Sequence, residues 1–442
     1  MTIGALLLAA AGLTVANAVQ GPRLLDAQIN PAAAVDGAGA RLVLRIDQTI
    51  AHLTPDQVSV TPSVPVETKS DGAALILRFG DSLRYATTYQ ILAKVRSATT
   101  GASSTLKYSF GTPEGAFYAL QHPTSKADGN APTQIVRSFV GSTEQQVVRK
   151  QPHIEQYAVA DPAIAVVTSD TDGAGVLTVG PIDGSEPSQT LAENSEISQL
   201  KSSGPSGLFG FVVTPLSDSD QAGDGQFNLY DPVARKLITV SGLDGKPLYP
   251  LDWAFVPGTT SIVAQTDDAS LYLIDAVNGT PPRPLGGHSR MYGFVPGSPT
   301  LIVEDSGDYK AIDLARGNTS TLPALEVPDS AAIQQLVPLA AERGYVGWVA
   351  TQDGASLILV MSDGHSRQIY AEDPDPTGGI QSICLSPNGQ YVAVARIPRD
   401  AATNPDSSGF ANTTELVDTT TGRTDQEVAG SNINWCNQTA AS

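Results

Sequence analysis

Two stretches near the middle of the chain are copies of one pattern, and this repetition constrains the fold more than any other feature. Asp252–Gly258 (DWAFVPG) and Met291–Gly297 (MYGFVPG) each end in Pro-Gly, and the second pair follows the first by 39 residues. Each copy leads into a second apolar segment and then into a third that ends in Asp, with Gly four positions later. An Asp at a strand end can bond the turn backbone, and the Gly supplies a positive φ. The Asp and Gly pairs of this pattern are Asp275 and Gly279, Asp313 and Gly317, and Asp418 and Gly422.

Units of 40–45 residues with four short strands are typical of β-propeller blades. The repeat predicts six blade starts, near Ile154, Ile197, Leu251, Met291, Ile333 and Ile380. The segment 433–436 (INWC) resembles the first strand of one more blade, and Gln134–Arg149 offers two strands that would complete it. Closing the ring with both chain ends removes exposed sheet edges. The prediction is an all-β chain whose residues 130–442 form a propeller of six or seven blades.

One segment of this region also resembles a known family. Residues 384–395 (CLSPNGQYVAVA) look like the SPDGKYLAVA strand-turn-strand of WD40-like and TolB-like propellers. The Trp-Asp and Gly-His pairs of strict WD40 repeats do not recur here. The resemblance therefore implies a bacterial envelope propeller in preference to a eukaryotic scaffold.

Residues 24–113 follow a different pattern, with period-2 apolar segments separated by Asp-Gly, Thr-Pro and Thr-Gly turns. Five strands are predicted, at residues 42–46, 58–60, 74–79, 89–95 and 106–110. The ordered set Pro31, Asp47-Gln48, Thr88-Tyr89 and Ser109-Phe110 resembles the SbsA-type bacterial Ig-like domain of surface-layer and other envelope proteins. That resemblance implies a small β-sandwich that acts as a spacer or stalk and contains no catalytic residues.

Residues 1–22 are predicted to be a signal peptide or a membrane anchor helix. The run Ile3–Val19 is uncharged and has the length of a signal h-region or a short span. Ala16-Asn17-Ala18 fits a cleavage site, but no Lys or Arg precedes the run. Both interpretations place the protein outside the cytoplasm, either anchored through residues 3–19 or secreted after cleavage near Ala18.

The net charge limits which partners are expected, and the two cysteines limit which disulfides can form. The formal net charge of −19 repels nucleic-acid phosphates and anionic lipid headgroups, so nucleic acid is not an expected partner. Only Cys384 and Cys436 occur, and in an exported protein they are predicted to form one disulfide. Two buried thiols are the alternative.

No pattern in the sequence predicts a catalytic, cofactor-binding or metal-binding residue. The five histidines lie outside any ligand spacing, and no nucleophile elbow occurs. The acidic loops at 170–173 and 218–225 depart from the EF-hand pattern, and the three tryptophans lie in apolar strand patterns. We therefore expect a non-catalytic binding or scaffold protein that presents its propeller to a protein or glycan of the cell envelope. The alternatives are a propeller hydrolase or lyase with its site in the channel, and a passive structural envelope component.

Overall fold

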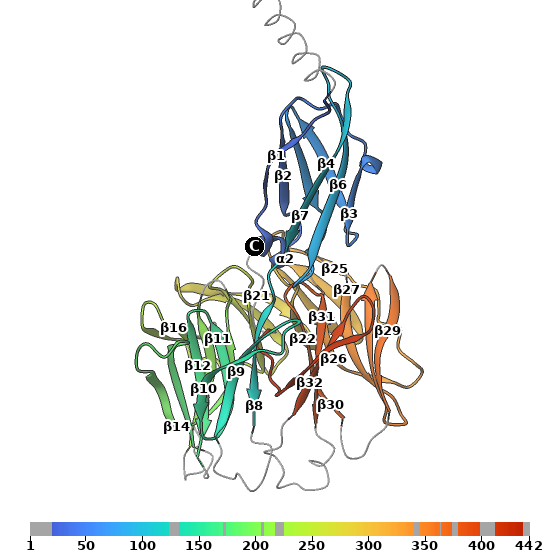
Figure 1. Cartoon of the computed structure of the whole chain (residues 1–442). Helices are drawn as coiled ribbons and strands as arrows, with labels where there is room; N and C mark the ends of the chain where they lie inside the picture. The colour runs from blue at the N-terminus through green and yellow to red at the C-terminus, as the bar shows by residue number, and fades with distance from the viewer. Residues whose placement is uncertain are drawn as a thin grey trace, which may run out of the picture. The chain divides into compact units, whose positions relative to one another are not determined.

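The computed structural model describes residues 20–122, 132–170, 174–204, 207–216, 225–339, 344–362, 364–373, 379–397 and 412–435. The chain forms two compact units, Met1–Gly115 and Ala116–Ser442 (Figure 1). The predicted signal or anchor run at residues 3–19 lies outside the described residues. Within the described part of the chain, no helix has the length and apolar character that a membrane crossing requires.

The first unit consists of two antiparallel sheets. The first sheet has the order β1-β2-β5-β4, with β1 (Leu24–Gln28), β2 (Arg41–Ile46), β4 (Val66–Asp71) and β5 (Ala74–Phe79). The second has the order β3-β6-β7, with β3 (Val58–Thr61), β6 (Thr88–Arg96) and β7 (Ser103–Gly111). Alternate residues of β6 are buried, and Phe79 of the first sheet contacts Phe110 of the second, with ring centroids 6.2 Å apart.

All five strands predicted for this unit are present, as β2, β3, β5, β6 and β7. Strands β1 and β4 and the helix α2 (Pro31–Asp36) were not predicted. The short helix begins where it does because the Asn30 side chain accepts a hydrogen bond from the Ala33 N–H at 3.2 Å and Pro31 fits the first turn. Residues 55–57 form one 3-10 turn.

The second unit consists of antiparallel sheets in which each strand pairs with the next along the chain. The first blade strands are β8 (Ala116–Gln121), β9 (Thr133–Phe139) and β10 (Gln145–Gln151). A seven-stranded sheet follows, with β11 (Ile154–Ala160), β12 (Ala163–Ser169), β13 (Gly175–Pro181), β14 (Gln189–Ser202), β15 (Phe209–Pro215), β16 (Gln226–Asp231) and β17 (Lys236–Thr239).

Four four-stranded sheets complete the unit. They are β18 (Asp252–Phe255), β19 (Ile262–Gln265), β20 (Ser270–Asp275) and β21 (Thr280–Gly287); β22 (Arg290–Phe294), β23 (Thr300–Asp305), β24 (Asp308–Asp313) and β25 (Asn318–Thr321); β26 (Ala332–Pro338), β27 (Gly344–Ala350), β28 (Ser356–Ser362) and β29 (His365–Glu372); and β30 (Gly379–Leu385), β31 (Tyr391–Ile397), β32 (Thr413–Asp418) and β33 (Thr424–Ala429).

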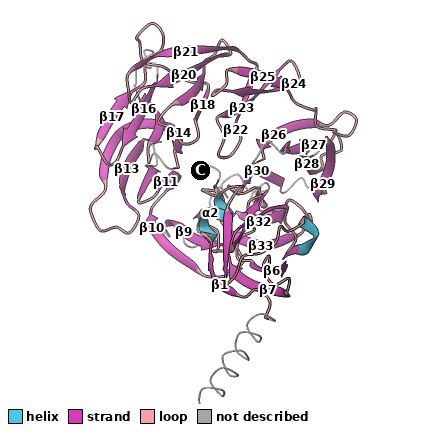
Figure 2. Ribbon diagram, turned by 90° about the horizontal axis from the view of Figure 1, so that it is seen from above, coloured by secondary structure: helices cyan, strands magenta, loops and turns pink. Residues whose placement is uncertain are grey.

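These sheets are arranged around a common centre, as in a β-propeller (Figure 2). The inner strands β11, β14, β18, β22, β26 and β30 contact one another in that order. Strand β14 belongs to two blades, because its first half pairs with β13 and its second half with β15. The six predicted blade starts all lie at the beginning of an inner strand or, for Ile197, where the second half of β14 begins.

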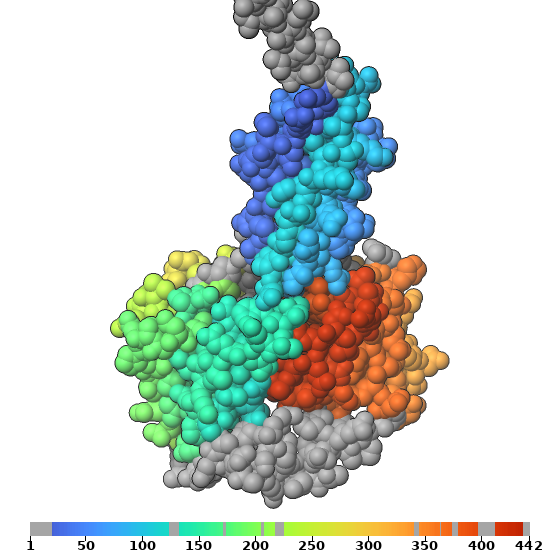
Figure 3. Space-filling model, in the orientation of Figure 1, coloured from blue at the N-terminus to red at the C-terminus, as the bar shows by residue number. Residues whose placement is uncertain are grey.

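Residues from the C-terminal end close the ring. Leu120 of β8 and Ser431 exchange two backbone hydrogen bonds of 2.9 Å, and Asn434 N–H donates to the Tyr118 carbonyl at 2.9 Å. Residues 431–435, which we call the closing strand, therefore take the inner position of the blade that β8, β9 and β10 continue, with Ser431 forming an isolated bridge to β8, and the described residues form seven blades. The segments coloured teal and red lie side by side on the surface (Figure 3). Closure by both ends was predicted, but β8 was not, because the prediction began the propeller at residue 130.

The predicted turn chemistry is confirmed. Asp275 accepts a hydrogen bond from Asn278 N–H at 3.1 Å, and Asp418 accepts from Thr421 N–H at 2.7 Å. The glycines that follow, Gly279, Gly317 and Gly422, all have φ near +70°. A side chain with a Cβ would be strained at these positions, which is why the Asp and Gly spacing recurs.

Candidate functional site

Three inner strands carry a glutamine two residues after the blade start. These are Gln156 in β11, Gln199 in β14 and Gln335 in β26. Each lies at or beside an irregularity in strand pairing, where the register shifts. A β-bulge bends the strand locally and re-aims a side chain, so a residue there can reach beyond its own sheet.

Each of these glutamines bonds the backbone of the next blade, and we call them latch glutamines. Gln156 Nε2 donates to the Ile197 carbonyl at 3.0 Å, and its Oε1 accepts from Leu200 N–H at 3.2 Å. Gln335 bonds both peptide groups of Ile383, donating to the carbonyl at 2.8 Å and accepting from the N–H at 2.9 Å. Gln199 donates to the Pro250 carbonyl at 3.1 Å.

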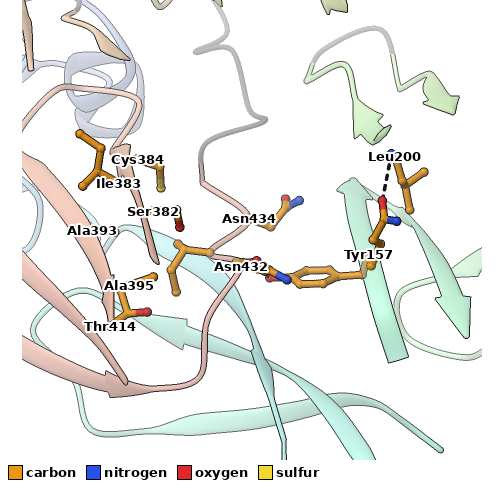
Figure 4. A pocket seen from close by; sticks show the side chains of 12 residues that line it. Tyr157, Leu200, Ser382, Ile383, Cys384, Ala393, Ala395, Thr414, Asn432 and Asn434 are labelled. Carbon is orange, nitrogen blue, oxygen red and sulfur yellow. Dashed lines mark hydrogen bonds between the residues drawn. The ribbon is translucent and has the colours of Figure 1, made fainter. Parts of the chain in front are cut away.

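The last blade has a serine at the latch position. Ser382 follows Ile380 by two residues, and the register of β30 shifts between them as in the latch strands. A serine side chain is too short to span to the next blade, and the described residues show no latch hydrogen bond at this seam. Beside it lies a pocket of about 320 Å³, which we call the seam pocket (Figure 4). Its lining residues are Gln156, Tyr157, Leu200, Ser382, Ile383, Cys384, Ala393, Ala395, Thr414, Asn432, Ile433 and Asn434.

The lining of the seam pocket combines small apolar side chains with neutral hydrogen-bonding groups. Thr414 donates its hydroxyl proton to the Gly430 carbonyl at 2.8 Å, and Tyr157 donates to the Asn432 carbonyl at 2.7 Å. Burial raises the pKa of Tyr157 well above its usual value of 10, so the phenol stays protonated. None of the twelve lining residues carries a charge at neutral pH.

The carboxamide of Asn434 is buried in this pocket without hydrogen-bond partners. Its side chain is 2% exposed, and neither Oδ1 nor Nδ2 has a hydrogen-bond partner in the described structure. Gln156, which lines the same pocket, has both ends of its carboxamide bonded. In Figure 4 the Asn434 side chain lies between the strand that carries Cys384 and the strands that carry Tyr157 and Leu200. A buried carboxamide without partners is unfavourable, at a cost of about 1–3 kcal/mol, and calls for an explanation.

Cys384, one of the two residues predicted to form a disulfide, lines this pocket and is not a free thiol. Cys436 lies outside the described residues. The pairing of Cys384 with Cys436 therefore stays a prediction.

Two charged clusters of the propeller are formed by ion pairs within the fold. His288 Nδ1 and Lys310 Nζ lie 2.9 and 2.6 Å from the two carboxylate oxygens of Asp305. Arg396 bonds Glu372 at 2.6 Å and Glu415 at 2.8 Å. Among the described residues, no three His, Cys, Asp or Glu side chains are grouped so as to hold a metal ion.

The tryptophans and the acidic loops, which were also considered as sites, are placed as follows. Trp253 and Trp435 are buried in the blade packing that was predicted for them, and Trp348 is half-buried. Of the acidic loops, residues 171–173 and 217–224 lie outside the described residues.

The latch glutamines and Asn434 were not predicted from the sequence. The missed signal is a triplet, Ile-x-Gln, at three of the predicted blade starts: Ile154-Glu155-Gln156, Ile197-Ser198-Gln199 and Ile333-Gln334-Gln335. Ser382 stands at this position in the last blade, as Trp253 and Gly293 do in two earlier blades, so the triplet alone does not single out the seam. Asn434 gives no such signal, because only the structure reveals that its side chain lacks partners.

Comparison with known proteins supplies no family. No protein-family model and no curated protein sequence matches the chain. Among solved structures, the chain is similar to an uncharacterized protein from Listeria monocytogenes, at 10% identity and a TM-score of 0.48, over 71% of this chain and 90% of that one.

Two further similarities involve proteins with described or suggested activities. One is a putative 6-phosphogluconolactonase from Bacteroides uniformis, at 13% identity and a TM-score of 0.42, over 73% of this chain and 98% of that one. The other is the β-propeller domain of the Trilobed protease from Pyrococcus furiosus, at 8% identity and a TM-score of 0.43, over 78% and 95%. Similarities this remote assign no activity, and the fold assignment rests on the strand topology described above.

Proposed function

We propose that this protein is a non-catalytic, extracytoplasmic binding protein whose propeller takes up part of a protein or glycan partner in the seam pocket. The buried, unpartnered carboxamide of Asn434 is the observation that carries the proposal. Hydrogen-bonding groups without partners in a pocket are a means of recognition, and the neutral lining supplies contacts for binding. A catalytic site of the hydrolase or lyase type would instead require ionisable side chains that converge on the pocket.

The first unit is proposed to be an Ig-like spacer of the SbsA type. The strand orders β1-β2-β5-β4 and β3-β6-β7 match the ABED and CFG sheets of constant-type Ig domains. Tyr89, near the start of the sixth strand, accepts a hydrogen bond from Arg84 N–H at 3.0 Å through its hydroxyl. A tyrosine with this bond at this place is a hallmark of the Ig fold.

The location is part of the same proposal. The uncharged run at residues 3–19 would anchor the chain to the membrane, with release after Ala18 as the alternative. On either route the propeller is displayed to partners outside the cytoplasm.

The test is capture of partners from detergent-solubilised cell envelope with the full tagged chain, followed by mass spectrometry and glycan analysis. Three baits are compared: the natural sequence, Ser382→Gln and Ser320→Gln. The first substitution places a latch-type side chain at the seam pocket. The second makes the same change on the exposed outer strand β25.

We expect one stoichiometric partner on the natural and Ser320→Gln baits and its loss from Ser382→Gln. An empty eluate from folded natural bait contradicts the binding function. Equal capture by all three baits shows that the partner does not use the seam pocket.

A further inference from the structure

We infer that the seam pocket recognises a neutral ligand through an amide group, which pairs with the carboxamide of Asn434. The inference rests on the proposed binding function and specifies its chemistry. The ligand group is a peptide amide or the acetamido group of an N-acetylated sugar, since both carry one amide N–H donor and one carbonyl acceptor.

First, Asn434 has unused hydrogen-bonding capacity in its side chain. A carboxamide offers two N–H donors and one carbonyl acceptor, and in Asn434 all of these are unpaired and buried. Its backbone, in contrast, is fixed, because Asn434 N–H donates to the Tyr118 carbonyl at 2.9 Å. The backbone of Asn434 is therefore fixed against β8, and its side chain presents its donors and its acceptor to the pocket.

The second step is a template that the fold itself supplies. At the preceding seam, Gln335 binds the N–H and the carbonyl of Ile383 with bonds of 2.9 and 2.8 Å. A carboxamide in this propeller thus already bonds a backbone N–H and a backbone carbonyl, which belong to the two successive peptide groups of one residue. At the last seam Ser382 takes the place of the latch glutamine, so among the described residues no latch carboxamide lies at this position, and a ligand amide can enter the seam pocket beside it.

The third step is the character of the pocket walls. Ala393 and Ala395 are small, and Ile383 and Ile433 are apolar, so a methyl or short alkyl group beside the amide would be in favourable contact. A carboxylate, phosphate or ammonium group would lose its hydration here and find no opposite charge among the lining residues. The pocket therefore favours a neutral amide over an ionic ligand.

The experiment is calorimetric titration of the full chain with three neutral probes. Chitotriose carries acetamido groups, acetyl-trialanine amide carries peptide groups, and cellotriose has a similar sugar backbone without any amide. We expect binding of chitotriose or of the peptide, and no binding of cellotriose. The probe that binds identifies the source of the amide.

Substitutions test whether the probe binds in the seam pocket. Asn434→Leu and Ser382→Gln should each weaken binding of the active probe by about tenfold or more, since the hydrogen bonding of the carboxamide or the space for the ligand amide is lost. Asn318→Leu and Ser320→Gln make the same changes on the exposed strand β25 and should leave binding unchanged. Asn434→Leu should also raise the melting temperature of the ligand-free protein, which shows that the variant folds and that its loss of binding is local.

The inference is overturned if neither amide probe binds the folded natural chain, if cellotriose binds as tightly as chitotriose, or if Asn434→Leu binds unchanged. If the amide probes fail while envelope capture still depends on Ser382, the ligand class is wrong and the binding function stands. If capture fails as well, both are wrong.

Discussion

Gln335 illustrates how single side chains join neighbouring blades. Its carboxamide bonds both peptide groups of Ile383, so Gln335→Leu would leave a donor and an acceptor of the next inner strand without partners. We expect the free energy of unfolding to fall by about 1–3 kcal/mol, measured by urea denaturation. Gln334→Leu is the matched control, because Gln334 is exposed and bonds only within its own strand. Equal effects of the two substitutions would contradict the latch.

Substitution of Asn434 should change the free energy of unfolding in the opposite direction. Its carboxamide is buried without partners, so replacing it with the similarly sized, apolar Leu removes a desolvation penalty and no hydrogen bond. We expect Asn434→Leu to raise the free energy of unfolding of the ligand-free chain by about 1–3 kcal/mol. Denaturation of this variant beside Gln335→Leu gives the comparison. A loss of stability in Asn434→Leu would mean that the carboxamide serves the fold.

The ion pairs of Asp305 should make the free energy of unfolding depend on pH. Partial burial acts to raise the pKa of Asp305, but hydrogen bonds and charges from Lys310 and His288 outweigh it and hold the pKa below its usual 3.8. Because the folded-state pKa is the lower one, this stabilisation is present above the unfolded-state pKa and is lost as the pH falls through the folded-state pKa.

We therefore expect Asp305→Asn to be less stable than the natural chain at neutral pH, and the difference to shrink below about pH 4. Urea denaturation at several pH values measures it. Asp308→Asn, an exposed neighbour in β24, should show little difference at any pH. A difference for Asp305→Asn that persists at low pH would contradict the assignment.

At the scale of strands, the sequence predicted those that repeat. The inner strands of six blades begin where a β-branched or long apolar residue recurs every 40 residues or so, and their burial makes that pattern visible. Strands β1 and β4 were missed because they lie at the edges of their sheet, where few residues are buried. Strand β8 was missed because four consecutive residues are buried, so alternation is lost.

The site was less predictable than the strands for a related reason. Clusters of ionisable residues are the usual sign of a site in a sequence. The seam pocket is instead lined by amides, hydroxyls and aliphatic groups, which occur everywhere in the chain. Aligning the blades does not single out Ser382, because Trp253 and Gly293 also stand where Gln156, Gln199 and Gln335 do, and only the pocket beside Ser382 makes it informative. Cys384 was the one pocket residue singled out beforehand, and for a different role.

The closing strand should be an energetic centre of the propeller. Trp435 is 1% exposed and packs against Phe117 of β8, with ring centroids 5.1 Å apart, and against Tyr391 of the last blade at 6.5 Å. It therefore joins the two ends of the ring. We expect Trp435→Ala to lower the free energy of unfolding by about 3–5 kcal/mol, measured by chemical denaturation.

Trp348→Ala is the control for this substitution. Trp348 is half-buried in β27, away from the closure, and should cost less when truncated. If Trp348→Ala lowers the free energy of unfolding as much as Trp435→Ala, the closing strand does not contribute more to stability than other strands.

At the scale of the whole ring, hydrogen bonds such as those from Gln426 to the Phe139 and Ser142 carbonyls join the last blade to the first, and a covalent bond at the seam pocket would add to them. Cys384 lies on the last blade at this seam, and the predicted partner Cys436 follows Trp435 directly in the sequence. A disulfide between them would close a loop of roughly 50 residues and stabilise the chain by about 4 kcal/mol in the chain-entropy model. We expect Cys384→Ser, Cys436→Ser and the double variant to lose similar amounts of stability, and dithiothreitol to lower the melting temperature of the natural chain alone. Additive losses in the double variant, or a natural chain that dithiothreitol leaves unchanged, would show that two separate thiols, and no covalent bond, lie at the seam.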